Sequence, residues 1–231
     1  EHVRRAFPEV YQHLTEKVRY DLGSDGKPHT DKSGRKLGRE WNNRKSYRDK
    51  WWIFGEPRGD LRPALEGLTR YIATVETAKH RVFQFLDVSI LPDNMIVVIA
   101  DADAATIAVL SSRVHAKWSL FSGATLEDRP RYSKSRCFDP FPFPDLSDVQ
   151  RQQLRNAGEE LDALRKRVLA DHPDVTLTGL DNVLEKLKGG IVLTDKDEDV
   201  KQRGLVLILK ELHETIDGLT MDAYGWPRDV S

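Results

Sequence analysis

Basic and hydroxyl side chains are concentrated in residues 129–136, which read Arg-Pro-Arg-Tyr-Ser-Lys-Ser-Arg. Four cations and three hydroxyl groups fall within this segment, and no acid interrupts them. Arg and Lys neutralise phosphates, and Arg also makes bidentate contacts with guanine in the major groove. Residues 137–144, Cys-Phe-Asp-Pro-Phe-Pro-Phe-Pro, are expected to anchor the segment rigidly. The pattern is typical of phosphate binding, and a solvated basic loop beside an apolar plug is the alternative.

A second basic stretch lies in residues 27–50, which carry nine cations and three acids. The net charge of the whole chain is only −1, so the overall balance conceals both stretches. A nearly neutral chain with local basic patches favours a module that touches DNA while other parts of a larger protein do other work.

The bulk composition narrows the class of protein. The chain has 231 residues, 39% of them hydrophobic, which is enough for one large domain or two small ones. The single cysteine excludes a disulfide within the chain and argues against a multi-cysteine metal site. There is neither an apolar run of membrane-spanning length nor a secretory signal. We therefore expect a cytosolic protein, and its start at Glu1 rather than Met suggests a piece of a longer one.

Motifs of known catalytic sites are missing from the sequence. It contains no Gly-x-Gly-x-x-Gly, no Gly-x-x-x-x-Gly-Lys and no Gly-x-Ser-x-Gly. The seven histidines are scattered, and none forms a His-x-x-x-His pair. We interpret His80 and His115 as surface or supporting residues and not as metal ligands.

Three further features of the sequence could indicate a catalytic site. Asp101 and Asp103 follow a predicted strand, where catalytic carboxylates often lie, but Asp103 is better placed as the N-cap of the next helix. Cys137 has no base assigned beside it, so a buried apolar role is predicted. Residues 139–142, Asp-Pro-Phe-Pro, superficially resemble the Asp/Asn-Pro-Pro-Tyr loop of amino-methyltransferases, but the prolines are not adjacent and we reject the match.

The hydrophobic pattern predicts the elements of the first part of the chain. A helix is expected over residues 8–20, a polar glycine-rich loop over 21–38 and a basic aromatic stretch over 39–54. A short helix over 61–66 leads to the strands.

Runs of β-branched and aromatic residues predict strands over 71–75, 81–86 and 95–100, with a turn at 91–94. A single helix is expected over 103–121. Its apolar residues recur at spacings of three or four and are expected to share one face: Ile107, Leu110, Val114, Trp118 and Phe121.

The composition changes after Pro144, and helical patterns follow. Ser147 and Gln150 form a capping-box pattern that opens a helix reaching about residue 170. A second helix spans 180–187 and is closed by two glycines, and a third spans 200–219. We therefore predict an α+β fold, with a mixed α/β domain over 1–146 (residues 1–40 being a helix and a flexible lead-in) and an all-α domain over 147–231.

From about residue 41 to 145 the chain resembles the target recognition domain of MmeI-type proteins, which are large type II restriction–modification enzymes and related phage-defence adenine methyltransferases. The segments that carry the resemblance are RKSYRDKWWIFGE (44–56), RYIAT (70–74), AKHR (78–81), LPDN (91–94), VLSSRVH (109–115) and RYSKSRCFDPFPFP (131–144). The C-terminal helices are similar to the helical domain that ends such proteins.

The resemblance implies a sequence-specific duplex-DNA recognition module without its catalytic core. The core, with its S-adenosylmethionine site, would belong to the same parent chain, and no cofactor is expected in these residues. The target adenine would be flipped out of the duplex into that core. The fragment itself is expected to be inert. No metal site and no membrane contact are implied.

The family's base-reading positions lie in the loop before the basic segment, and they correspond here to Glu127, Arg129 and Arg131. Glu accepts a hydrogen bond from cytosine N4, and Arg forks onto guanine O6 and N7. Asn94, in the turn before the third strand, is a further candidate for reading adenine. Other cations are expected to clamp phosphates without reading sequence: Arg44, Lys45, Arg48, Lys50, Lys79, Arg81, Lys134 and Arg136.

The nearby aromatic residues are predicted to brace the core and not to stack on bases; these are Trp51, Trp52, Phe54, Phe138, Phe141 and Phe143. Two rival functions stay open. One is a small metal-dependent nuclease using Asp101, Asp103 and His115. The other is a protein-interaction scaffold in which the helices bind a partner and the basic stretches are merely solvated.

Overall fold

The computed structural model describes residues 2–52, 59–126 and 129–228. The chain divides into two compact units, residues 1–63 and residues 64–231, which are described separately. The prediction at Phe54 lies outside the described residues. Within the described residues, no helix combines the length and the apolar character needed to cross a membrane.

The first unit is small and irregular. Helix α1 (His2–Ala6) precedes α2 (Pro8–Leu14), which continues as a π-helix over Thr15–Arg19, so the helix predicted for 8–20 is confirmed. Residues 21–38 contain no helix and fold into turns closed by the bridges Leu22–Pro28 and Thr30–Lys36. A 3-10 turn over Arg39–Trp41 leads to α3 (Lys45–Asp49).

The short helix α4 (Leu61–Ala64) spans the boundary between the units in the sequence, and the second unit continues with a three-stranded antiparallel sheet in the order β2-β1-β3. The strands are β1 (Arg70–Val75), β2 (Gln84–Asp87) and β3 (Ile96–Ile99), as the β-branched runs predict. In register, Ile72 pairs with Phe85 on one side and with Ile99 on the other. All three side chains are buried, so this row forms the centre of the sheet's core.

The single helix predicted for 103–121 is two helices, α5 (Ala104–Ser111) and α6 (Arg113–Ser122). Ser112 causes the break. Its backbone is extended, and its hydroxyl donates to Val109 O (2.6 Å). The Ser112 hydroxyl oxygen also accepts the N–H of His115 at the start of α6. The turn at Ser112 changes the direction of the apolar face, which is why Phe121 is 91% exposed instead of buried as predicted.

The basic segment is not a loop. Strand β4 (Ala124–Leu126) pairs antiparallel with β5 (Arg129–Arg131), and a π-helix over Lys134–Phe138 follows. The chain enters β4 through Gly123, where an added Cβ would lie 2.5 Å from Ser119 O and 3.0 Å from Arg131 O. Only glycine permits this close approach of α6 to β5.

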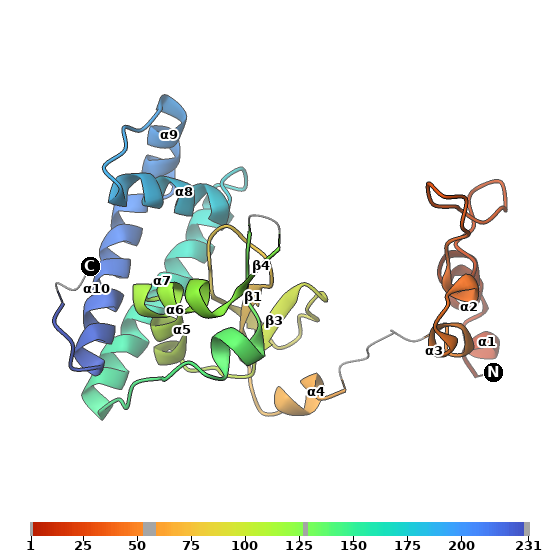
Figure 1. The fold of residues 1–231 in the computed structure, drawn as a ribbon, viewed down its shortest axis with the longest axis horizontal. Helices are drawn as coiled ribbons and strands as arrows, with labels where there is room; N and C mark the ends of the chain where they lie inside the picture. The colour runs from red at the N-terminus through yellow and green to blue at the C-terminus, as the bar shows by residue number, and fades with distance from the viewer. Residues whose placement is uncertain (1, 53–58, 127–128, 229–231) are drawn as a thin grey trace. The chain divides into compact units, whose positions relative to one another are not determined.

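Four helices complete the second unit: α7 (Asp148–Asp171), α8 (Leu177–Lys188), α9 (Asp195–Arg203) and α10 (Val206–Ala223). The capping box at Ser147 and Gln150 is present, as predicted. The third predicted helix is interrupted, because Gly204 ends α9 and Leu205 adopts a left-handed conformation (φ 50°) before α10. The long helices α7 and α10 lie side by side (Figure 1).

Helix α7 also packs along α5, and Gly158 allows the close contact. A Cβ at this position would lie 2.1 Å from Ala104 O. The core of the helices includes Ala105 and Val109 of α5, while Ala104 and Ile107 belong to the core of the sheet. Helix α5 therefore contributes to both cores. The fold is α+β, as predicted, and the boundary predicted near residue 146 lies inside this unit and stays a prediction.

Candidate nucleic-acid interface

The chain just after β1, residues 76–78, joins two of the predicted DNA-reading elements. We call these residues the Glu76 segment. The Glu76 N–H donates to Met95 O (2.7 Å), next to Asn94, and Glu76 O accepts from Tyr132 N (2.7 Å). Thr77 forms a bridge with Arg131. Asn94 in the turn before β3 and Arg131 in β5, far apart in sequence, are thus held on either side of one segment.

Arg129 and Arg131 lie two residues apart in β5, so their side chains share one face of the hairpin. Both are exposed. Arg131 Nε donates to Glu76 Oε1 (2.5 Å) while about half of its side chain faces solvent. Among the described residues, Arg129 has no ionic partner. Glu127, the other predicted reader in this hairpin, lies outside the described residues.

Arg81 holds the hairpin onto the sheet. Its guanidinium donates to Val75 O at the end of β1 and to Pro130 O in β5 (3.2 Å). It also lies over the ring of Tyr132, 4.9 Å from the centroid. Burial lowers the pKa of Arg81. A positioning role of this kind was missed in the sequence, because only the folded chain brings these carbonyl groups together.

A buried pair beneath β5 fixes Tyr132, the residue after Arg131. Tyr132 Oη donates to His115 Nε2 (3.1 Å), and His115 Nδ1 donates to Leu110 O (2.9 Å). Phe83 packs edge-on against both rings. Burial lowers the pKa of His115 to about 4, so the ring is neutral at pH 7. His115 is therefore a buried residue that supports Tyr132, which agrees with the supporting interpretation and rules out the surface one.

The segment after β5 is anchored as its Pro-aromatic composition predicts. Cys137 is fully buried, which agrees with its predicted apolar role, and Phe141 is buried beside Trp118 and His115. Trp118 Nε1 donates to Cys137 O (3.0 Å). Lys134 and Arg136 emerge from this anchored segment as exposed cations.

The predicted phosphate clamps of the second unit have different surroundings. Lys79 Nζ contacts Asn182 Oδ1 (2.7 Å) and Glu185 Oε2 (3.0 Å). Lys134 contacts Asp139 (2.9 Å) but its side chain is 77% exposed. Arg136 has no ionic partner within the ranges that the structure describes. Lys134 and Arg136 are therefore the more available cations.

In the first unit, Arg44, Lys45, Arg48 and Lys50 are all exposed, at or beside α3. Arg44 and Arg39 lie over the ring of Tyr47, with the Arg39 guanidinium 4.4 Å from its centroid. These four exposed cations lie within seven consecutive residues, and we call them the basic patch of the first unit.

The predicted bracing aromatics divide into two groups. Trp51 and Phe141 are buried and Phe138 is half-buried, as expected. Trp52 and Phe143 are 58% and 40% exposed, so the core interpretation is wrong for Trp52 and only partly right for Phe143. Phe143 still packs against the rings of Phe138 and Phe141.

The residues of the nuclease alternative serve the fold. Asp103 caps α5 through Ala105 N (3.0 Å), as predicted, and contacts Arg155 (2.8 Å). The hydrogen bond from Arg155 lowers the pKa of Asp103 to about 2. Asp101 accepts from the Thr106 hydroxyl (2.6 Å). In the described part of the chain, no three His, Cys, Asp or Glu side chains cluster so as to hold a metal.

Comparisons with known proteins match this architecture. Residues 71–145 match the family model "MmeI, target recognition domain", so the resemblance seen in the sequence is confirmed for this range. DNA methyltransferase A of Bacillus subtilis (strain 168) is 28% identical over 131 residues, which are 57% of this chain and 12% of that protein.

A solved structure shows the fold over a larger part of the chain. The type IIL restriction–modification enzyme MmeI in complex with DNA matches 82% of this chain with a TM-score of 0.58 and 20% identity. The match covers 22% of the MmeI chain. The chain thus spans a small part of the length of both proteins.

Proposed function

We propose that residues 71–145, as an MmeI-type target recognition domain, read a short duplex DNA sequence for an adenine-specific (N6) methyltransferase or restriction–modification enzyme. The observation that carries the proposal is the Glu76 segment. Within the matched range, this segment holds β5, with its two exposed arginines, next to the turn that bears Asn94. A rigid pair of exposed arginines on one strand face suits a groove edge.

In this proposal Arg129 and Arg131 fork onto guanines, Glu127 accepts from cytosine N4 and Asn94 reads adenine. Glu76 positions Arg131 by accepting one of its donors, which leaves the outer edge of the guanidinium for a base. Lys134 and Arg136 bind phosphates beside the reading strand. Lys79 and the basic patch of the first unit (Arg44, Lys45, Arg48 and Lys50) are further phosphate contacts, and Arg81 supports the hairpin.

Methyl transfer itself belongs to a catalytic core elsewhere in the parent protein. S-adenosylmethionine would supply the methyl group there, and none of the described residues is assigned to hold it. The contribution of this chain is selection, because it would bind one site and present the target adenine for extrusion into the core. By itself the chain is expected to be catalytically inert.

Selection from a randomised duplex pool tests the proposal. The chain is incubated with the pool at moderate salt, and the bound fraction is sequenced. A short enriched motif is the expected result. Binding without enrichment would reduce the chain to a positioning surface, and no binding at low salt would favour the protein-interaction scaffold.

A further inference from the structure

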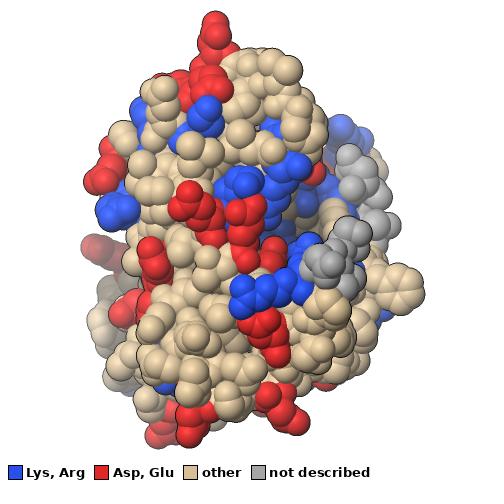
Figure 2. All heavy atoms as spheres, turned by 90° about the vertical axis from the view of Figure 1, so that its left-hand side faces the viewer, with Lys and Arg blue, Asp and Glu red and all other residues tan. Residues whose placement is uncertain are grey.

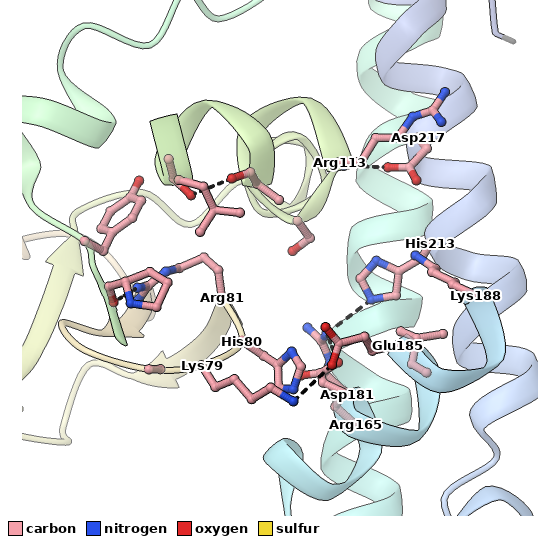
Figure 3. Close-up of a pocket in the computed structure, with 18 of the residues that line it drawn as sticks. Lys79, His80, Arg81, Arg113, Arg165, Asp181, Glu185, Lys188, His213 and Asp217 are labelled. Atoms are coloured by element: carbon pink, nitrogen blue, oxygen red, sulfur yellow. Dashed lines mark hydrogen bonds and ion pairs between the residues drawn. The ribbon is translucent and has the colours of Figure 1, made fainter. Parts of the chain in front are cut away.

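A pocket of about 350 Å³ lies in the second unit between the hairpin and the C-terminal helices. Its walls come from residues 78–81, from α6, from β5 and from α8, and α7 and α10 contribute Arg165, His213 and Asp217 (Figure 3). We call it the α6–α8 pocket. One face of the molecule is hollowed, and Lys and Arg side chains gather around the hollow (Figure 2). The volume is within the range of small-molecule sites.

Two buried polar atoms of the pocket lack partners. Asp181, 8% exposed, places Oδ1 3.7 Å from Arg165 Nη2, but its Oδ2 has no hydrogen-bond partner among the described residues. The buried hydroxyl of Ser111, at the end of α5, is also without a partner within that part of the chain. Unpaired buried polar atoms are costly, so two of them in one pocket indicate a ligand that carries hydrogen-bond donors.

The charge of the pocket favours an anion. Its lining includes the six cations Lys79, Arg81, Arg113, Arg131, Arg165 and Lys188. Only three acids, Asp181, Glu185 and Asp217, oppose them, which leaves an excess of three positive charges. The ammonium of Lys188 has no hydrogen-bond partner in the described ranges, and its charge acts on Asp181, His213 and Asp217 together.

Apolar side chains also line the pocket. Leu120 of α6 and Pro130 of β5 do so together with Ala78, whose N–H donates to Pro130 O (3.4 Å), and Leu184 of α8 contributes as well. Leu120 is 62% exposed although it borders a pocket, so it is available for contact. A ligand with a flat apolar face, an edge rich in N–H donors and an anionic group satisfies all three features.

We propose that the α6–α8 pocket binds a single nucleotide: its apolar side chains pack against one base, Asp181 and Ser111 accept the N–H groups of the base, and Lys188 binds the phosphate. An exocyclic amine or ring N–H pairs with a carboxylate, and a phosphate pairs with an ammonium. The choice of a nucleic-acid ligand rests on the proposed function. The nucleotide is either free in solution or displaced from a duplex held at the neighbouring β5.

Titration of the chain with AMP, GMP, CMP and TMP, followed by NMR, tests the site, with inorganic phosphate as the reference probe. At least one nucleotide is expected to bind about fivefold or more tightly than inorganic phosphate. Ser111→Ala removes a hydroxyl that makes no internal hydrogen bond, so the fold is retained, and Lys188→Gln removes the phosphate contact. Each is expected to weaken binding about fivefold. Lys196→Gln, in α9 outside the pocket, is the matched control.

A duplex containing 2-aminopurine separates the two sources of nucleotide. A fluorescence rise that Ser111→Ala abolishes would identify a base displaced from DNA, whereas free nucleotide binding without this signal would identify a soluble ligand. Equal affinity for inorganic phosphate and nucleotides, or no binding of either, would overturn the proposal of a nucleotide site and would mean that water fills the pocket. If the pocket proposal failed in this way, enrichment of a motif from the duplex pool would still support the proposed function. Nucleotide binding without duplex binding would instead refute the proposed function.

Discussion

The side chain of Arg131 contacts that of Glu76, Nε to Oε1 (2.5 Å), and the N–H of the next residue, Tyr132, donates to Glu76 O (2.7 Å). The same Glu76 also donates its N–H to Met95 O (2.7 Å). One acidic residue therefore sets both the direction of a predicted guanine-reading side chain and its place relative to the turn with Asn94.

Glu76→Gln tests this positioning. The backbone bonds remain, and the amide oxygen of Gln can still accept from Arg131 Nε, but the contact loses its charge assistance and holds the guanidinium less firmly. We expect discrimination at one base position to fall by about 1–2 kcal/mol, because a bidentate contact depends on orientation. The measurement compares binding of the preferred duplex with that of single-base variants. Unchanged discrimination would mean that Arg131 does not depend on Glu76.

Substitutions of Arg129 and Lys134 are expected to change DNA binding in two different ways. Arg129→Ala should lower preference at one base position by about 1–3 kcal/mol while hardly changing the salt dependence. Lys134→Ala should weaken all duplexes alike and reduce the slope of log affinity against log salt by about one. Affinities at several salt concentrations provide the test, and equal effects from both variants would refute the division of roles.

Gly158→Ala should destabilise the protein although alanine is the better helix former. The new Cβ would lie 2.1 Å from Ala104 O and 3.0 Å from Ile107 Cγ2, so α5 and α7 must separate. We expect a loss of about 1–3 kcal/mol in the free energy of unfolding. The control is Gly218→Ala in α10, where a Cβ meets only the flexible end of Arg228 at 3.4 Å. That variant should gain about 0.5–1 kcal/mol.

Acid should destabilise the second unit through His115. Its pKa is about 4 in the folded protein because the ring is buried, whereas the pKa of an unfolded histidine is about 6.5. The unfolded chain therefore takes up the proton first, so stability is full above pH 6.5 and falls as the pH drops toward 4. The loss approaches about 3 kcal/mol at the lower limit. Denaturant titrations at several pH values measure it.

NMR supplies an independent check of the same residue. The Leu110 carbonyl can only accept, so the His115 proton lies on Nδ1 and Nε2 accepts from Tyr132. The nitrogen shifts of His115 should report this tautomer at pH 5.5, still neutral. A protonated ring at that pH would contradict the buried arrangement.

Local patterns predict most of the elements, and tertiary contacts explain the exceptions. Periodicity locates the strands and the starts of the helices, and the capping box at Ser147 is visible in the sequence. The break at Ser112 escapes notice because the apolar spacing continues across it. Ser112 is a good N-cap residue, but His115 occupies the position where a capping box would place Glu or Gln.

The residues of the candidate site also fall into those whose role the sequence predicts and those whose role it does not. Arg129, Arg131, Lys134 and Arg136 are recognisable from their density in one segment. Glu76 is not, and Arg81 is predicted as a phosphate contact and not as a positioning residue, because one Glu and one Arg near strand ends carry no local signal of positioning. Their roles arise only when antiparallel pairing brings residues 76–78 against β5, some 55 residues later in the chain.

Because α5 contributes to both cores, it limits which segments of the chain can be exchanged by recombination. A recombination event between residues 104 and 158 would join an α5 and an α7 that had not been selected together, and the tight Ala104–Gly158 contact would tolerate few such pairs. An exchange near residue 63, between the compact units, would leave that contact intact. The reading strand and the C-terminal helices are therefore expected to pass between lineages as one block.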